Sequence, residues 1–197
     1  MSIAVIDTGC ANIASVRFAL ERAGLDHAVV TAPGEAGDCD RLILPGVGAA
    51  GPAMERLRER GWDEALAADD RPLLGICLGM QVLFERSAEG GVACLGLLPG
   101  EVERLPRADG LVWPHMGWNA LDGLTDDEPL LAGVEPGSYA YFVHGYFVPA
   151  GPVTRARCDY GAPVSAIVRS GHVAGCQFHP ERSGAVGARI LSNFAGV

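Results

Sequence analysis

The sequence predicts an α/β fold in which a central, mostly parallel sheet is flanked by helices and carries an antiparallel edge. In the first half of the chain, short apolar segments typical of strands alternate with amphipathic stretches typical of helices, which indicates a parallel sheet covered on both faces. From about residue 102 onward, short strands separated by turns replace this alternation. The chain has 197 residues, 49% of them hydrophobic. It is therefore long enough for one well-filled core, and residues 1–197 are expected to form a single domain.

The chain opens with a strand and a helix. Residues 2–6 are a short apolar run that predicts a strand. Asn12 is a residue type that caps the start of a helix, and Gly24 is one that ends it. Between them, apolar residues recur at the spacing of one helix face, namely Ile13, Val16, Leu20 and Ala23. Further strands are expected around residues 28–31 and 41–44, and a helix is expected to end near residue 60.

The second half predicts an antiparallel pair and a closing helix. Residues 164–169 and 172–177 have strand character and are joined at Ser170-Gly171, a typical tight turn. Residues 185–194 predict the last helix. These elements place the antiparallel part of the sheet at one edge.

Cys77 lies in the most informative segment, Gly75-Ile76-Cys77-Leu78-Gly79-Met80-Gln81. Residues 72–76 predict a buried strand and residues 80–85 a helix, so the cysteine is expected on the turn between them. The flanking glycines allow neighbouring backbone to approach closely, which would direct the sulfur out of the sheet edge. The start of a helix also favours thiolate over thiol. The pattern predicts a catalytic nucleophile.

His179 and Glu181 supply the partners that such a nucleophile needs. Pro180 disfavours a helical conformation for His179 and favours an extended one. In extended chain, residues i and i+2 face the same side, so the Glu181 carboxylate can hold one ring nitrogen while the other reaches Cys77. This is a Cys-His-Glu relay, in which the imidazole transfers the proton and the carboxylate fixes its tautomer.

The other cysteines carry no such pattern. We expect them to be inert core residues: Cys10, Cys39, Cys94, Cys158 and Cys176. Six cysteines without a CxxC pair, and a start without a signal peptide, predict reduced thiols in the cytoplasm. No spacing suggests a metal site, and no cofactor is expected.

Charge and hydropathy argue against two classes of partner. The net charge is −9 and the fifteen basic residues are scattered, so nucleic acid is not expected as a partner. The longest apolar stretch, residues 72–84, is shorter than the ~20 residues that span a bilayer and is interrupted by polar residues and glycines, so no membrane segment is expected.

The loop Gly46-Val47-Gly48 has two interpretations. It follows a strand but lacks the spacing and the lysine of a phosphate-binding loop. Its N–H groups, together with that of Leu78, could stabilise the oxyanion of an acyl transfer. An ordinary tight turn explains the loop equally well when it is taken alone.

The two catalytic segments resemble those of class I, triad-type glutamine amidotransferases, whose fold is flavodoxin-like. Further segments resemble the glutaminase subunits of imidazole glycerol phosphate synthase, in histidine biosynthesis. They are Asp7 to Asn12, Leu44 to Gly48, Pro114 to Asn119, Tyr141 to His144 and Phe178 to Gly184. The resemblance implies hydrolysis of glutamine to glutamate and ammonia, which passes to a cyclase subunit that makes imidazole glycerol phosphate and aminoimidazole carboxamide ribotide.

The resemblance also implies roles for individual residues. Cys77 is the nucleophile, His179 the acid/base and Glu181 the orienter, with Gly46, Val47, Gly48 and Leu78 at the oxyanion. Glutamine would be held by Gln81, Glu89, Gly145 and Tyr146, although a solvated surface carboxylate is an equally good interpretation of Glu89. His144 is expected to be structural.

Three residues are expected to face the cyclase, namely His115, Trp118 and Arg182, although a structural histidine is the favoured interpretation of His115. A half-buried core position is the alternative for Trp118. Two positions depart from the family pattern, since Gly145 stands where serine is usual and Arg182 where lysine is usual. The glycines of the loop 46–48 would allow docking to change its conformation, so low activity is expected without the partner.

Other functions fit parts of the pattern. One is the glutaminase of pyridoxal phosphate synthase or anthranilate synthase, against which His115-Met116-Gly117-Trp118-Asn119 argues. Another is a catalytically silent regulatory module, although no member of the triad is missing. A cysteine hydrolase acting on a different bond is a third, against which Gln81 and Gly145-Tyr146 argue.

Overall fold

The computed structural model describes residues 1–9, 11–107 and 110–197. A seven-stranded sheet lies at its centre, in the order β11-β12-β13-β4-β3-β1-β2. The parallel strands are β1 (Ile3–Ile6), β2 (His27–Val30), β3 (Arg41–Gly46), β4 (Leu73–Cys77) and β13 (Val173–Cys176). The antiparallel edge consists of β11 (Thr154–Asp159) and β12 (Pro163–Ser170). The predicted fold class is confirmed.

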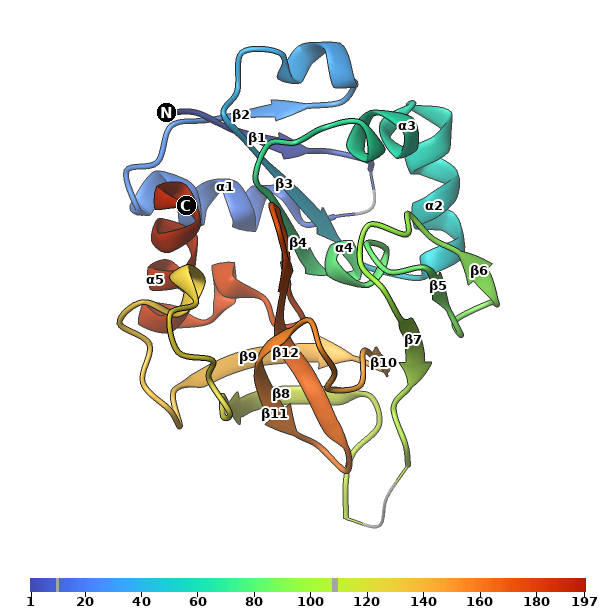
Figure 1. Cartoon of the computed structure of the whole chain (residues 1–197), viewed down its shortest axis with the longest axis vertical. Helices are drawn as coiled ribbons and strands as arrows, with labels where there is room; N and C mark the ends of the chain where they lie inside the picture. The colour runs from blue at the N-terminus through green and yellow to red at the C-terminus, as the bar shows by residue number, and fades with distance from the viewer. Residues whose placement is uncertain (10, 108–109) are drawn as a thin grey trace.

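Helices cover both faces of this sheet. Helices α1 (Ile13–Arg22) and α5 (Gly184–Gly196) lie on one side, and α2 (Ala50–Glu59) and α3 (Trp62–Ala67) lie on the other (Figure 1). Successive residues of a strand point to opposite faces, so Ile3 and Val5 pack in the core beneath α1 and α5, while Ala4 and Ile6 pack in the core beneath α2 and α3. Among the helices that the structure describes, none is both long and apolar enough to cross a membrane.

Smaller elements surround one end of the sheet. A four-stranded sheet contains β5 (Arg86–Ser87), β6 (Val92–Ala93), β7 (Glu101–Arg104) and β10 (Tyr146–Phe147). A two-stranded ribbon pairs β8 (His115–Ala120) with β9 (Tyr139–His144). Three short 3-10 helices complete the fold: η1 (Pro33–Ala36), η2 (Pro129–Leu131) and η3 (Pro180–Arg182).

Several local predictions are confirmed. Asn12 accepts a hydrogen bond from the backbone N–H of Ser15 at 3.3 Å, as an N-cap does. Ser170 pairs with Val173 at the turn between β12 and β13. The last helix, α5, spans the predicted residues and extends slightly beyond them at both ends.

The prediction of a helix at residues 80–85 is wrong in its bounds. Helix α4 spans only Leu78–Gln81, a single turn. Beyond Gln81, the N–H groups of Leu83 and Phe84 bond to carbonyl oxygens only three residues back, those of Met80 and Gln81, which is a tighter turn than an α-helix has. The chain therefore leaves the helix after one turn.

Candidate active site

Cys77 lies at the junction of β4 and α4, where the backbone makes a strained turn. Its φ angle is 54° and its ψ angle is −112°, a conformation that non-glycine residues rarely adopt. A Cβ at Gly75 would lie 2.7 Å from the backbone of Gly79 and Met80, and one at Gly79 would lie 1.8 Å from the carbonyl oxygen of Leu44. The two glycines therefore let α4 pack directly on the strands, as predicted.

The neighbouring strand brings the loop 46–48 to the same place. Gly46 pairs with Cys77 in the parallel register of β3 and β4. Val47 and Gly48 line a cavity beside Cys77, and Gly48 has a φ angle of 96°. Gly46 has a different position: a Cβ there would lie 2.7 Å from the backbone N of Gly79. Of the three, Gly46 is thus the residue that packs the loop onto α4 behind the cavity.

His179 and Glu181 are paired as predicted. The backbone of His179 is extended, and its Nδ1 lies 2.8 Å from Oε1 of Glu181. Both side chains are buried, with 10% and 3% of their surfaces exposed. Burial lowers the pKa of His179, but hydrogen bonds with Cys77 and Glu181 outweigh burial and raise it to about 10. The imidazole is therefore held in its protonated form beside the sulfur at neutral pH.

Cys77 and His179 both line a cavity of about 270 Å³. A small ligand would fill a cavity of this size. The predicted substrate residues Gln81, Glu89, Gly145 and Tyr146 all line it, together with Val47, Gly48 and Leu78 of the proposed oxyanion site. Pro114, Val143 and His144 also line it; the first two belong to family-like segments of the sequence but had been given no role at the site. Five separate segments of the chain thus converge on the thiol.

Gln81 and Glu89 both contribute polar atoms to this cavity. The side-chain Nε2 of Gln81 donates to the carbonyl oxygen of Tyr146 at 2.8 Å and to Oε1 of Gln177 at 2.9 Å. Its own Oε1 is left to accept a hydrogen bond from a ligand. One carboxylate oxygen of Glu89 accepts from the N–H of Ala50, at the start of α2. Glu89 is partly buried, so the freely solvated surface position does not describe it.

Gly145 has a structural reason to be glycine. A Cβ at this position would lie 2.8 Å from Cζ2 of Trp113, whose ring packs against the backbone there. The indole of Trp113 is in turn covered by the guanidinium groups of Arg104 and Arg107, at 4.9 and 5.3 Å from its centre. The glycine that stands here in place of the usual serine therefore leaves room for the ring of Trp113.

His144 and His115 form a buried pair. His144 Nδ1 lies 2.9 Å from the carbonyl oxygen of Tyr146, to which it donates, and its Nε2 lies 3.0 Å from Nδ1 of His115. Burial lowers the pKa of His144 to about 3 and that of His115 to about 4. Both rings are therefore neutral at pH 7.

His115 lies where a structural histidine would, and its burial argues against the interface role. Only 2% of its surface is exposed, and its ring stacks on Tyr160 and Phe142, with ring centres 3.8 and 4.9 Å apart. Residues of β8 alternate between the core and solvent, and His115 has the inward parity. Trp118 is 55% exposed, which excludes a core position for it.

Trp118, Tyr141 and Arg182 form a surface cluster near the triad, which we call the aromatic cluster. The rings of Trp118 and Tyr141 meet edge to face with centres 5.8 Å apart, and the guanidinium of Arg182 lies 5.1 Å from the centre of the Tyr141 ring. Tyr141 also contacts the triad segment through its backbone, since its carbonyl oxygen accepts from the N–H of His179 at 2.9 Å.

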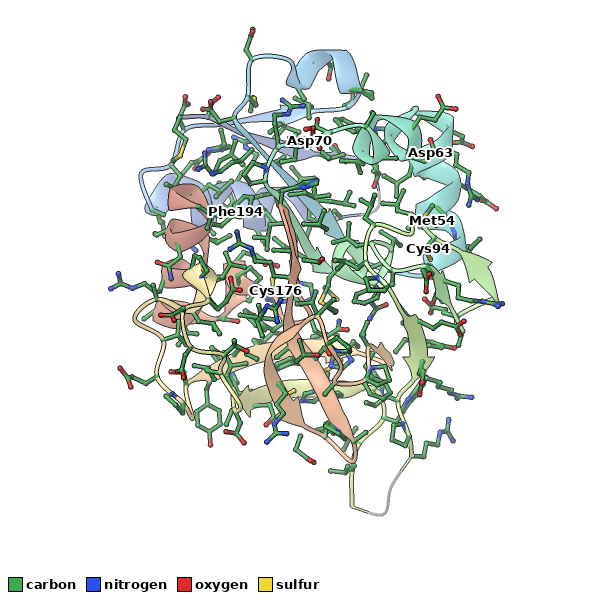
Figure 2. The ribbon with its side chains drawn as sticks, in the orientation of Figure 1. Met54, Asp63, Asp70, Cys94, Cys176 and Phe194 are labelled. Carbon is green, nitrogen blue, oxygen red and sulfur yellow. The ribbon has the colours of Figure 1, made fainter. Side chains whose placement is uncertain are left out.

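The remaining cysteines differ from Cys77. Cys176, at the centre of the molecule in Figure 2, and Cys158 are buried, and burial raises the pKa of Cys176 well above its usual value and that of Cys158 to about 12. Cys94 and Cys39 are only partly buried, and they pack against the margin of the core. Cys10 lies outside the described residues.

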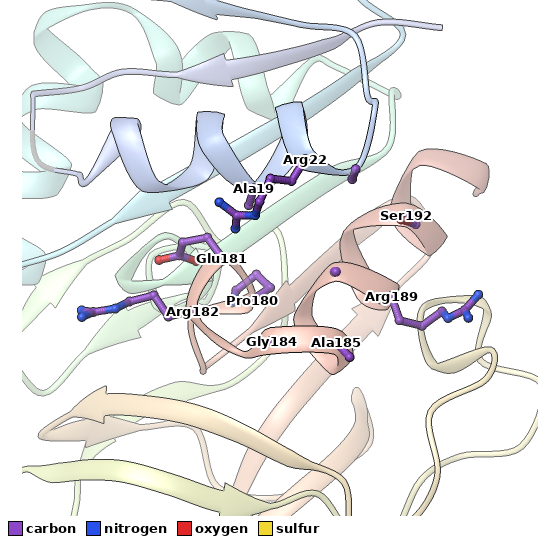
Figure 3. A pocket seen from close by; sticks show the side chains of 11 residues that line it. Ala19, Arg22, Pro180, Glu181, Arg182, Gly184, Ala185, Arg189 and Ser192 are labelled. Atoms are coloured by element: carbon purple, nitrogen blue, oxygen red, sulfur yellow. The ribbon is translucent and has the colours of Figure 1, made fainter.

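A second cavity, of about 620 Å³, lies between α1, η3 and α5 (Figure 3). Glu181 and Arg182 line it, but Cys77 and His179 do not. The smaller cavity is therefore the candidate active site. Within the described part of the chain, no three His, Cys, Asp or Glu side chains gather where they could hold a metal ion.

Comparisons with known proteins match nearly the whole chain. Residues 4–196 match the family model Glutamine amidotransferase class-I. A relative from Xanthomonas euvesicatoria pv. vesicatoria (strain 85-10), named Imidazole glycerol phosphate synthase subunit HisH, is 54% identical over 98% of this chain and 96% of its own length. One of the same name from Vibrio cholerae serotype O1 is 48% identical over 98% and 97%. This chain belongs to the HisH-type class I glutamine amidotransferases.

Solved structures share the fold of this class I amidotransferase. A crystal structure of a glutamine amidotransferase superposes with a TM-score of 0.75 at 23% identity, covering 99% of both chains. The structure of PurLQS from Thermotoga maritima contains a chain that gives a TM-score of 0.73 at 22% identity, covering 99% of this chain and 97% of that one. At such identities the likeness concerns the fold alone.

Family membership decides between the functions that the sequence left open. A HisH-type amidotransferase is an enzyme that hydrolyses glutamine for histidine biosynthesis. The curated relatives cover this chain almost completely and share one name, so a glutaminase of another pathway and a silent regulatory module are not favoured.

Proposed function

We propose that this chain is the glutaminase subunit of an imidazole glycerol phosphate synthase, with residues 1–197 acting as one domain, and that Cys77, His179 and Glu181 perform the hydrolysis. The observation that carries the proposal is the buried His179–Glu181 pair, whose histidine lines the same cavity as the strained cysteine, in a chain of this family. The relatives are named as subunits of that synthase.

The thiolate of Cys77 attacks the side-chain amide carbon of glutamine. The resulting oxyanion accepts hydrogen bonds from the N–H of Leu78, at the start of α4, and from the loop 46–48. The protonated His179 gives its proton to the leaving nitrogen, so ammonia departs and a glutamyl thioester remains on the sulfur. Neutral His179 then takes a proton from water, whose attack on the thioester releases glutamate and restores the thiolate.

The α-amino-acid end of the substrate is held by residues that line the same cavity as the thiol. The free Oε1 of Gln81 and the carboxylate of Glu89 both line the cavity and suit the ammonium of an α-amino acid. The backbone of Gly145 and Tyr146 supplies further polar groups without a hydroxyl side chain at 145.

The partner is a cyclase subunit that receives ammonia. The aromatic cluster of Trp118, Tyr141 and Arg182 is the docking surface, because Trp118 and Arg182 are exposed, Tyr141 is half-buried between them, and Trp, Tyr and Arg are the types that dominate protein interfaces. Docking there reaches the triad through the hydrogen bond from His179 N–H to Tyr141. Gly48, with its positive φ, lets the oxyanion loop change conformation in response.

The test is glutamate release by the purified chain, alone and with the cyclase and its nucleotide ligand. We expect low activity alone and a large rise in the complex. Full activity of the isolated chain would refute the coupling, and no glutamate release in either sample would refute the glutaminase.

A further inference from the structure

Gln177, the residue two positions before His179, contacts the reactive sulfur. Its side chain is completely buried, and its Nε2 lies 3.8 Å from Sγ of Cys77, within hydrogen-bonding distance for sulfur. Gln177 follows β13, whose register with β4 pairs Cys176 with Ile76 and so brings residues 177 and 77 side by side. Gln177 begins the sequence motif that ends at Glu181, but the motif assigned it no role.

The orientation of the Gln177 amide is fixed by a chain of hydrogen bonds. The carbonyl oxygen of Tyr146 only accepts, so the Gln81 group 2.8 Å from it is the NH₂. The same NH₂ donates to Gln177 at 2.9 Å, so the atom of Gln177 on that side is its oxygen. The NH₂ of Gln177 must then face Cys77. His144 Nδ1 also donates to the Tyr146 oxygen, which holds that carbonyl in place.

A hydrogen-bond donor at this position favours the thiolate form of Cys77 over the neutral thiol. The neutral thiol can donate to the carbonyl oxygen of Val143, 3.7 Å from Sγ. The thiolate has no proton to donate and is stabilised by N–H donors. Gln177 is an uncharged donor whose direction is fixed, so its hydrogen bond adds to the effect of the protonated His179.

We propose that Gln177 is a further catalytic residue, whose amide N–H stabilises the Cys77 thiolate, and that Gln81 is a positioning residue that holds this amide in the donating orientation. The inference rests on the proposed function, in which that thiolate is the nucleophile. It gives Gln81 a second task beside its contact with the substrate.

The experiment measures the pH dependence of alkylation of Cys77 by iodoacetamide in the full chain, with mass spectrometry of the peptide that contains Cys77. Gln177→Met keeps a side chain of similar length and removes the donor. We expect the midpoint of the alkylation profile to rise by roughly half to one pH unit, with about a three- to tenfold slower reaction below it. Gln81→Met should shift the midpoint in the same direction by less.

Two further variants separate this effect from general damage. Cys176→Ala disturbs packing at the adjacent buried residue, whose Sγ contacts Gly75 instead, and should leave the midpoint unchanged. Gln177→Glu retains an acceptor for Gln81 and replaces the donor by a negative charge, so it should raise the midpoint at least as far as Gln177→Met. It also provides the test if Gln177→Met does not fold.

The outcomes distinguish the inference from the function on which it rests. An unchanged midpoint in folded Gln177→Met or Gln177→Glu, or an equal shift in Cys176→Ala, would overturn the role of Gln177. If Cys77 of the unmodified chain reacted no faster than the other thiols at low pH, the proposed nucleophile itself would fail.

Discussion

Trp113 occupies the space that a side chain at position 145 would need. A Cβ added to Gly145 would lie 2.8 Å from Cζ2 of the indole. Gly145 lines the candidate active site, so the ring of Trp113 packs against backbone that borders the cavity.

This contact predicts an interaction between the two positions. Gly145→Ser alone should destabilise the chain by about 1–3 kcal/mol, because the rigid indole cannot move aside freely. Trp113→Leu opens the space. In that background, Gly145→Ser should lower the free energy of unfolding by at least about 0.5 kcal/mol less than it does alone. Urea unfolding of the two single variants and the double variant measures this. Simple additivity would show that the close approach is not energetically important.

His179 and Glu181 should differ in how much activity they support. His179→Ala removes the group that carries the proton, and we expect a loss of about 10²–10⁴-fold in glutaminase turnover. Glu181→Gln retains the shape of the side chain and only weakens the orientation of the ring, so its loss should be at least about tenfold smaller. Steady-state assays with the cyclase present test which of the two variants loses more activity. Unchanged turnover in His179→Ala would assign the base to His144 instead.

The buried His115–His144 pair should make stability fall in acid. Burial lowers the pKa of both residues in the folded chain, to about 4 and about 3, below the value of about 6.5 in the unfolded chain. Their neutral forms therefore favour the folded state fully above about pH 6.5, and this contribution is lost as the pH falls toward 4 and 3.

His115→Phe tests this dependence, because phenylalanine can stack on Tyr160 and Phe142 without titrating. It should lower stability at neutral pH by about 1–3 kcal/mol, since His144 loses its donor, and yet flatten the decline between about pH 6.5 and 4. The test is to measure the free energy of unfolding of His115→Phe and of the unmodified chain across this pH range. A parallel decline in both proteins would exclude His115 as a source.

The aromatic cluster should govern activation by the partner. Trp118→Ala or Arg182→Ala should weaken binding of the cyclase by about 5–30-fold and reduce the rise in glutaminase activity, with the triad unchanged. Val29, exposed on the distant strand β2, provides a matched control, and Val29→Ala should leave binding unchanged. Titration of each variant with cyclase measures both quantities, and equal binding by all of them would place the interface elsewhere.

Much of this site could be predicted because its parts are local in the sequence. The turn at Cys77 depends on glycines two residues away on either side, and the His179–Glu181 pair depends on an extended i, i+2 spacing. Strand alternation with helices likewise predicts the parallel sheet.

The residues that sequence reasoning missed depend on contacts between distant segments. Gln177 meets Cys77 only because β13 lies beside β4, and Val143 reaches the sulfur from the separate β8–β9 ribbon. The inward position of His115 follows from the pairing of β8 with β9 and from packing on Tyr160, neither of which a single segment encodes, so the sequence left an interface role open. A signal for Gln177 was present in its position two residues before His179, on the same side of an extended chain.

The most direct test of the account is covalent trapping at Cys77. A glutamine analogue that carries an electrophile should label this thiol ahead of the others, glutamine should protect it, and Cys77→Ser should fold normally but lose at least about 10³-fold in glutamate release with the cyclase present. Mass spectrometry of the labelled peptides measures the selectivity. Selective, glutamine-protected labelling of Cys77 is the predicted result, and equal labelling of all the cysteines, or near-normal activity of Cys77→Ser, would contradict the account.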